Sequence, residues 1–156
     1  MEDTKKTSKV YFTDFRCRPD EGRTDKLKRL MKAAGMDKID MDGKFVAIKM
    51  HFGELGNMSF LRPNYAKAVA DMVRLCGGKP FLTDCNTLYP GSRKNAIEHL
   101  YCAWENGFTP LSAGCPVIIG DGLKGTDDIA VPVNGGEYVK AVSYTHLRAH
   151  ETVLDL

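Results

Sequence analysis

The chain alternates short apolar runs with stretches of helical periodicity, and this alternation constrains its fold more than any other feature. Residues 45–51 are apolar at nearly every position, as a buried parallel strand requires. Further short strand-like runs occur at residues 9–14, 80–84 and 116–119. Between them, apolar residues recur at spacings of three and four, which is typical of amphipathic helices. The sequence therefore predicts an α/β fold with a mainly parallel sheet and helices on both of its faces.

Glycine and proline mark the expected ends of the helices. The first helix is expected between Thr24 and Gly35, and Pro63 opens the second as a first-turn proline. A third helix is expected at residues 94–106. Residues 129–139 instead alternate in polarity around a glycine-rich turn, which predicts a β-hairpin at the edge of the sheet.

Composition argues against several classes of protein. A hydrophobic content of 43% and a charged content of 27% are typical of a folded globular chain. The sequence has no apolar run of the roughly 20 residues that span a membrane, and no basic run with interleaved aromatic residues for nucleic acid. Its first residues are polar and include acidic ones, unlike a signal peptide. We therefore expect a cytoplasmic protein that binds neither membranes nor nucleic acid.

The cysteine and histidine patterns do not predict a metal centre. The five cysteines are widely spaced and include no Cys-x-x-Cys pair, whereas iron–sulfur sites usually take cysteines at short local spacing. His146 and His150 have helical spacing, but the zinc-protease pattern requires glutamate where Leu147 stands. We expect no metal and no cofactor within this chain.

A glycine-rich segment matches a nucleotide-binding pattern without its structural context. Residues 120–125 read G-x-G-x-x-G and follow a predicted strand. The dinucleotide motif also requires a helix directly afterwards, because the pyrophosphate lies on the amides of that helix. Residues 126–133 instead read as a strand, so we do not predict a nucleotide site.

Polar residues follow the predicted strands at the edge where open parallel sheets bind ligands. His51 and Glu54 follow one strand, and Asp84 ends the next. An imidazole beside a carboxylate can act as acid and base, so these three are the candidate catalytic residues. Lys49 lies two residues before His51 and shares its face of the strand. The simpler alternative is a strand-end histidine bonded to a loop carbonyl.

Two expected helix starts favour an anionic ligand, because a loop that leads into a helix presents free backbone amides. Ser92 and Arg93 precede the third helix, where Ser92 is a candidate cap. Arg62 precedes the second helix and has the geometry to clamp a carboxylate or phosphate. A capped turn and a solvated arginine are the simpler alternatives. The candidate ligand-binding residues are Lys49, Arg62, Asn86, Thr87, Ser92 and Arg93.

Six segments carry a resemblance to a known family, namely residues 10–14, 49–54, 61–65, 83–89, 91–93 and 116–122. Through them, Lys9 to about Val139 resembles the amino-terminal half of the domain-of-unknown-function 362 family, often described as iron–sulfur centre proteins. The resemblance implies a redox or electron-transfer role and a redox partner. It also implies 4Fe–4S clusters, held by Cys-x-x-Cys-x-x-Cys runs in a carboxyl-terminal half that this sequence does not include.

The same resemblance predicts the organisation of the chain. We expect a disordered start at residues 1–8, a truncated α/β domain at residues 9–141 and a non-family tail at residues 142–156. The tail resembles a translated sequencing adapter of the kind found on proteins predicted from environmental DNA. The expected function is that of an amino-terminal fragment of an iron–sulfur centre protein with a strand-end ligand site. The alternatives are a non-redox small-anion-binding or enzymatic α/β module, or an inactive fragment.

Overall fold

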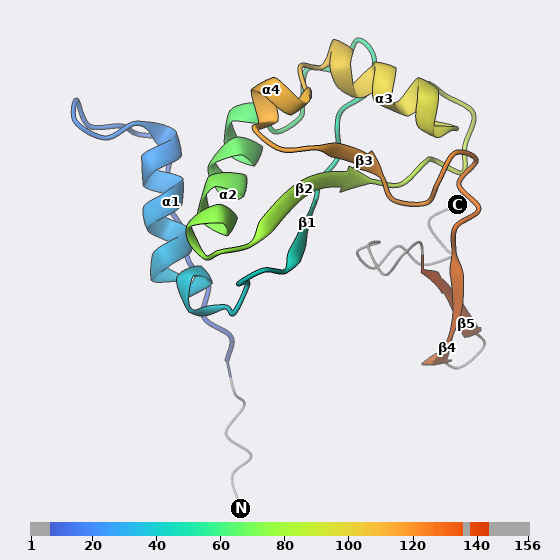
Figure 1. Cartoon of the computed structure of the whole chain (residues 1–156), viewed down its shortest axis with the longest axis horizontal. Helices are drawn as coiled ribbons and strands as arrows, with labels where there is room; N and C mark the ends of the chain where they lie inside the picture. The colour runs from blue at the N-terminus through green and yellow to red at the C-terminus, as the bar shows by residue number, and fades with distance from the viewer. Residues whose placement is uncertain (1–6, 136–137, 144–156) are drawn as a thin grey trace, which may run out of the picture.

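A three-stranded parallel sheet forms the centre of the molecule. In the computed structural model, which describes residues 7–135 and 138–143, the strands are β1 (Phe45–Lys49), β2 (Lys79–Asp84) and β3 (Val117–Ile119). They lie in the order β1-β2-β3, as Figure 1 shows. Each strand coincides with a predicted run, and all pairings between them are parallel. The predicted α/β class is therefore confirmed.

The described residues also form four α-helices and one short 3-10 helix, of which the first α-helix and the 3-10 helix precede β1. They are α1 (Arg23–Ala33), the 3-10 helix η1 (Met36–Lys38), α2 (Pro63–Leu75), α3 (Ala96–Glu105) and α4 (Pro110–Ala113). Pro63 is the first residue of α2, as predicted, because a first-turn proline loses no helical hydrogen bond. The four-residue helix α4 was not predicted. Its start is stabilised by reciprocal hydrogen bonds between Thr109 and Ser112.

The predicted strand at residues 9–14 is wrong, because the structure has no strand there. Val10 and Phe12 are 89% and 83% exposed. Asp14 instead accepts a bond from Lys26 Nζ at 2.5 Å, which ties the end of this segment to α1. Apolar β-branched and aromatic residues favour a strand only where a neighbouring strand is available to pair with them. Among the described residues, β1 pairs with β2 alone.

The hydrophobic core lies against one face of the sheet. The strand register aligns Ile48 with Leu82. Leu82 belongs to the core, and Ile48 packs against it. The helices α2, α3 and α4 contribute small residues that allow close approach to the strands. The fully connected core consists of Phe52, Ala66, Ala70, Leu82, Ala103, Phe108, Ala113, Cys115 and Ile119.

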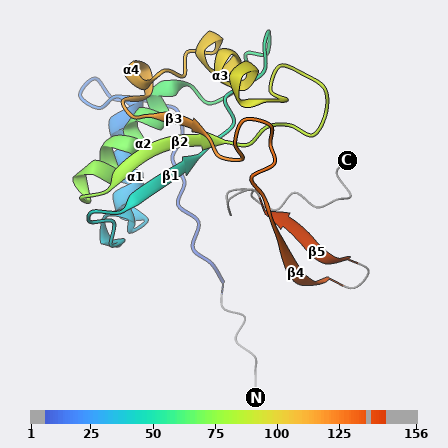
Figure 2. The same cartoon turned by 45° about the vertical axis from the view of Figure 1, so that its right-hand side comes forward.

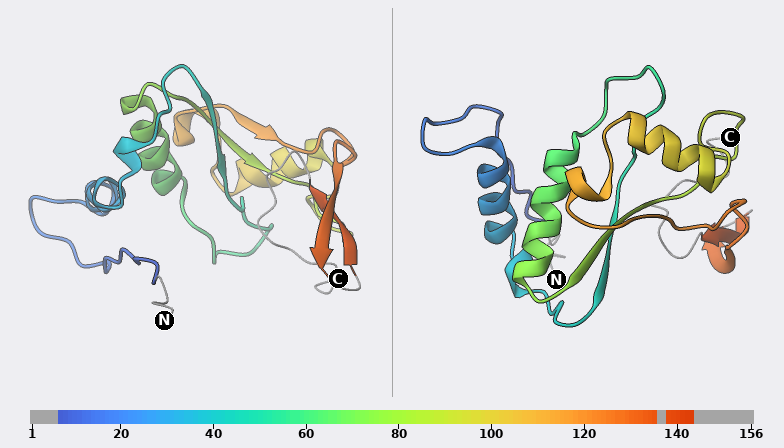
Figure 3. Two further views of the ribbon diagram at one scale, coloured as in Figure 1. Left: turned by 90° about the horizontal axis from the view of Figure 1, so that it is seen from below. Right: turned by 45° about the horizontal axis from the view of Figure 1, so that its top comes forward.

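The helices thus gather on one side, although cover on both faces was predicted. Helix α1 lies alongside α2 and away from the strands, as Figure 3 shows. On the other face Phe45 is 79% exposed, and Ile118 is also exposed. Among residues 7–128, no helix covers this second face with core side chains. The difference arises from the strand order β1-β2-β3, which advances in one direction, because crossovers of the usual right hand that advance the same way place their helices on the same face.

The predicted hairpin is present but does not extend the sheet. Strands β4 (Ile129–Gly135) and β5 (Tyr138–Ser143) pair antiparallel in a two-stranded sheet of their own. Figure 2 shows the hairpin projecting beside the parallel sheet. The expected placement at the sheet edge is therefore wrong. Residues 1–6 of the predicted disordered start (1–8) and residues 144–156 of the predicted tail (142–156) lie outside the described residues, as do His146 and His150.

Candidate functional site

The loops that follow the three parallel strands meet at one edge of the sheet, as the topology requires. The Met50 amide donates to the Thr83 carbonyl at 3.1 Å, and the Gly120 amide donates to the Asp84 carbonyl at 2.9 Å. These bonds continue the strand pairing past the ends of β1 and β3. The residues that follow each strand are therefore neighbours, although they are distant in sequence.

Asp84 is the centre of the polar network at this edge. Its side chain is buried, and its Oδ1 lies 2.8 Å from Lys49 Nζ and accepts the Cys85 amide at 2.9 Å. Its Oδ2 lies 3.6 Å from Arg93 and 3.5 Å from His99 Nε2. Burial disfavours the charged carboxylate, but the contacts with His99 and Lys49 outweigh it and lower the pKa of Asp84 to about 2. Asp84 is therefore ionised at neutral pH.

Glu54 joins the loop after β1 to the loop after β2. It accepts hydrogen bonds from Ser92 Oγ at 2.8 Å, from Arg93 Nε at 2.5 Å and from the Tyr89 hydroxyl at 3.2 Å. Arg93 also donates to the Tyr89 hydroxyl at 2.6 Å. Partial burial opposes ionisation of Glu54, but the bonds from Ser92 and Arg93 prevail and lower its pKa. Arg93 thus bridges two carboxylates, Glu54 and Asp84.

Gly53 is required where the first loop turns back toward α3. Its φ is +85°, and a Cβ at this position would lie 2.6 Å from the Asn106 amide nitrogen and 2.8 Å from the Phe60 ring. Asn106 donates to the Phe52 carbonyl at 3.0 Å, which holds the turn against the helix. Only glycine combines this backbone conformation with so close an approach.

His51 lies at the exposed side of the site. Its Nδ1 accepts a bond from the Gly53 amide at 2.8 Å. Partial burial, followed by the charge of Arg93, lowers the pKa of His51. His51 and Glu54 were predicted to act as a pair, but within the described residues no hydrogen bond joins them. Glu54 is instead committed to Ser92 and Arg93.

Asn86 and Asp121 connect the ends of β2 and β3. The Asn86 amide donates to both carboxylate oxygens of Asp121, at 3.0 and 2.9 Å, and the Asn86 side chain donates to Asp121 Oδ1 at 3.0 Å. On its other side, the Asn86 Oδ1 lies 3.3 Å from His99 Nδ1. This part of the network is buried.

Two predicted ligand residues do not join the network. The Arg62 guanidinium lies over the Phe60 ring, 4.8 Å from its centre, and donates to the Met58 carbonyl. Thr87 donates from its hydroxyl to the Tyr89 carbonyl at 3.1 Å. Neither side chain joins the polar network around Asp84, and the ligand roles of Arg62 and Thr87 stay predictions.

Ser92 was expected to cap α3, but Asn95 is the cap. The Asn95 side chain accepts the Glu98 amide at 3.0 Å, as a residue directly before the first helical turn can. Ser92 lies three residues earlier and turns to Glu54 instead. Arg93 likewise points inward and is buried, rather than lying at the helix end as a solvent-facing anion ligand.

His99, Asp121 and Tyr89 belong to the network but were not among the predicted site residues. His99 shares the buried face of α3 with Cys102 and Ala103, at helical spacings of three and four. A histidine on such a face needs hydrogen-bond partners, since a buried polar group without them is costly. That pattern is visible in the sequence and is the signal that would have identified His99.

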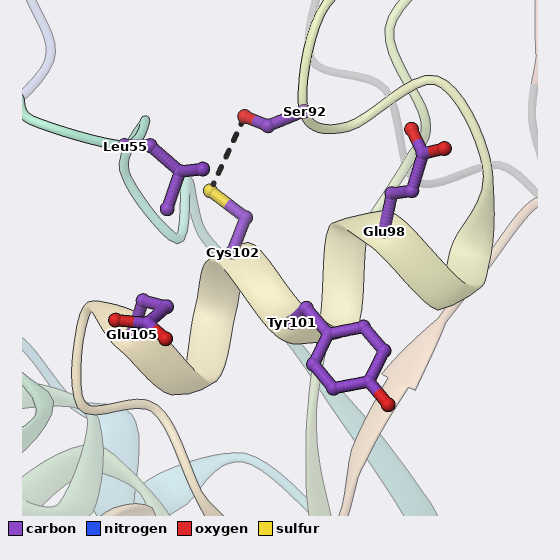
Figure 4. A pocket seen from close by; sticks show the side chains of 6 residues that line it. All are labelled: Leu55, Ser92, Glu98, Tyr101, Cys102 and Glu105. Carbon is purple, nitrogen blue, oxygen red and sulfur yellow. Dashed lines mark hydrogen bonds between the residues drawn. The ribbon is translucent and has the colours of Figure 1, made fainter.

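A shallow pocket of about 530 Å³ adjoins the network along α3. Its lining residues are Leu55, Ser92, Glu98, Tyr101, Cys102 and Glu105. Figure 4 shows Leu55, Ser92 and Cys102 converging, with Ser92 Oγ 3.7 Å from Cys102 Sγ, while Tyr101 points away from them. Ser92 is the link between pocket and network, because it also donates to Glu54.

The described cysteines do not fit an iron–sulfur cluster. Cys102 is buried on α3, Cys85 in the loop after β2 and Cys115 between α4 and β3, whereas Cys17 is exposed and Cys76 caps the end of α2. Within residues 7–135 and 138–143, no three His, Cys, Asp or Glu side chains form a group suited to a metal ion. A 4Fe–4S cluster usually needs four converging thiolates, so we derive no chemistry through one here.

Gly120–Gly125 forms a turn that leads to β4 and not to a helix, which agrees with the argument against a nucleotide site.

In the part of the chain that the structure describes, no helix has the length and apolar character needed to cross a membrane.

The fold and site together define an α/β protein with a buried polar network at the carboxyl edge of a short parallel sheet. The chain belongs to the DUF362 family, a domain of unknown function, whose model matches residues 46–154. The family resemblance is thereby confirmed. The match includes residues 142–154, which were expected to be a non-family tail, and the origin of that segment stays a prediction. No curated protein and no solved structure gave a significant match.

Proposed function

We propose that this chain binds a small anionic ligand at the carboxyl edge of its parallel sheet, with Lys49 and His51 as the donors. One observation carries the proposal: each of these two accessible side chains is oriented by a specific bond. Lys49 Nζ lies 2.8 Å from Asp84, with its side chain 33% exposed. His51 accepts the Gly53 amide through Nδ1 and is exposed.

The hydrogen bond to His51 determines which of its nitrogens serves a ligand. With Nδ1 accepting, the neutral ring carries its proton on Nε2 and can donate it. The lowered pKa of His51, caused by partial burial and by Arg93, favours this neutral form. The charge of Lys49 is a further, smaller cause of the lowered pKa of His51, so the two donors lie within electrostatic range of each other at the end of β1. A carboxylate or a phosphate accepts from both donors.

Ligand binding accounts for this geometry better than acid–base catalysis. A general base requires an unprotonated ring nitrogen facing the substrate. In His51 the unprotonated nitrogen faces the Gly53 amide instead. Glu54 and Asp84 are held ionised by their hydrogen-bond partners and are poor proton donors at neutral pH. The redox role and redox partner implied by the family resemblance remain expectations, as does the cytoplasmic location.

Isothermal titration with inorganic phosphate, and separately with acetate, tests the proposal. Lys49→Gln and His51→Gln should each weaken binding by about tenfold, since each removes one donor to a charged group. Lys44→Gln is the matched control, because Lys44 lies just before β1 at the opposite end of the strand and pairs with Asp40 in solvent. Equal affinities for all three variants and the native chain would show that the anion binds elsewhere or only non-specifically.

A further inference from the structure

His99 spans two polar groups on the buried side of the candidate site. The ring is completely buried on α3 and packs edge-on against Phe52, with ring centres 5.8 Å apart. Its Nδ1 lies 3.3 Å from Asn86 Oδ1, and its Nε2 lies 3.5 Å from Asp84 Oδ2. One imidazole therefore connects the end of β2 with the loop that follows it.

The hydrogen bonds of Asn86 determine the tautomer of His99. The Asn86 side-chain nitrogen donates to Asp121 Oδ1 at 3.0 Å and to the Gly122 carbonyl at 3.1 Å. Both partners only accept, so the amide nitrogen must face them and Asn86 Oδ1 must face His99. Because Oδ1 also only accepts, His99 Nδ1 must carry a proton.

The second nitrogen of the ring faces a carboxylate oxygen. Asp84 Oδ2 and His99 Nε2 are both buried, and neither has another well-formed hydrogen bond among the described residues. Since Oδ2 only accepts, the 3.5 Å contact becomes a hydrogen bond in the form of the ring that carries protons on both nitrogens. The geometry therefore directs His99 toward the same carboxylate that contacts Lys49.

We propose that His99 is a positioning residue of the anion site, an inference that rests on the proposed function. His99 contacts Oδ2 of Asp84, whereas Lys49 contacts Oδ1 of the same carboxylate at 2.8 Å. Rotation of that carboxylate would displace both contacts together. By holding Asp84, His99 holds the ammonium group of Lys49 in place for the ligand, without touching the ligand itself.

Two variants of His99 and one control test the proposal. His99→Leu removes both polar contacts, while His99→Gln retains a side chain that can donate to Asp84. Val73→Ala is the control, because Val73 is equally buried but lies on α2, outside the polar network. The readouts are phosphate affinity by isothermal titration and the titration midpoint of the Asp84 carboxyl by 13C nuclear magnetic resonance.

The native midpoint should lie at about 2. His99→Leu should raise it and weaken phosphate binding by about tenfold, through loss of one bond to a charged group. His99→Gln should recover part of the midpoint shift and part of the affinity, and Val73→Ala should change neither quantity, even if it lowers stability. An unchanged Asp84 midpoint and unchanged affinity in His99→Leu, or equal changes in Val73→Ala, would overturn the inference.

Two further results separate this inference from the proposed function. If the native chain binds no phosphate, the proposed function fails, and the ligand role of His99 fails with it. Even then, the titration midpoint of the Asp84 carboxyl in His99→Leu still tests whether His99 interacts with Asp84. In the native chain, a long-range 1H–15N correlation spectrum should show Nδ1 of His99 protonated. An unprotonated Nδ1 would overturn the inference, whether or not the variants fold.

Discussion

Lys49 at the end of β1 and Asp84 at the end of β2 form an ion pair of 2.8 Å across two neighbouring parallel strands. The carboxylate is buried, whereas the ammonium group is partly exposed. This pairing has a physical consequence, since a buried carboxylate needs partners to stay charged. Lys49, Arg93 and His99 provide them, and the Lys49 side chain stays 33% exposed.

Asp84 should make the chain sensitive to acid. Its folded pKa of about 2 lies below the ordinary value of 3.8, so its stabilisation is present above 3.8 and is lost as pH falls through about 2. The shift corresponds to roughly 2 kcal/mol of unfolding free energy. Urea unfolding between pH 5 and pH 2 should show this loss in the native chain, with Glu54 contributing in the same direction.

Asp84→Asn should be less stable than the native chain at pH 7, because it leaves Arg93 buried without one of its carboxylates. Its unfolding free energy should also change less between pH 5 and pH 2. Asp40→Asn is the control, since Asp40 pairs with Lys44 at the surface. An equal acid dependence in the native chain and Asp84→Asn would contradict the role given to Asp84.

Arg93→Lys should destabilise the chain although it conserves charge. The planar guanidinium donates to Glu54 and Tyr89 through different nitrogens, which a single ammonium group cannot reproduce. We expect a loss of about 1–3 kcal/mol in chemical denaturation. The same change at Arg29, which pairs with Glu21 on the surface, should cost less than about 0.5 kcal/mol. Equal losses at the two positions would mean that the bonds of Arg93 contribute little.

Gly53→Ala and Gly56→Ala separate backbone strain from steric conflict. Both glycines have positive φ, of 85° and 79°, but only at Gly53 would a Cβ collide with Asn106 and Phe60. Gly56→Ala should cost about 1 kcal/mol from conformation alone. Gly53→Ala should cost distinctly more, measured by thermal or urea unfolding. Similar costs for both would show that the first loop moves easily away from α3.

Leu82→Ala should destabilise the chain by about 2–5 kcal/mol, because it leaves a cavity in the core. His51→Ala should have a much smaller effect, since that side chain is exposed and water can replace it. Chemical denaturation of the two variants provides the comparison. If His51→Ala unfolds the chain as thoroughly as Leu82→Ala does, His51 is a structural residue and the proposed site is wrong.

The sequence predicted the regular elements well where local signals and burial agreed. Pro63 marked the start of α2, and the apolar run at residues 45–51 predicted β1, which ends two residues earlier at Lys49. It failed at residues 9–14, where strand propensity was clear but a pairing partner was not predictable from local sequence. The hairpin was recognised from its alternation, whereas its separation from the parallel sheet depends on contacts that the sequence does not display.

The candidate site was predictable in position but not in detail. The rule for parallel sheets identified Lys49, Asp84 and Asn86, because it depends only on where strands end. The direction in which Ser92 and Arg93 turn depends on Glu54, which comes from another loop. His99 was missed because its partners lie on loops and strand ends outside its own helix.

The most direct test of the anion site is a phosphate titration of the 15N-labelled native chain followed by 1H–15N correlation spectra. The account predicts saturable shifts concentrated on the His51 side chain and on the amides of Lys49, Gly53 and Cys85, which lie beside the two donors and their anchors. Non-saturating shifts, or shifts concentrated on the basic helix α1 instead, would contradict it.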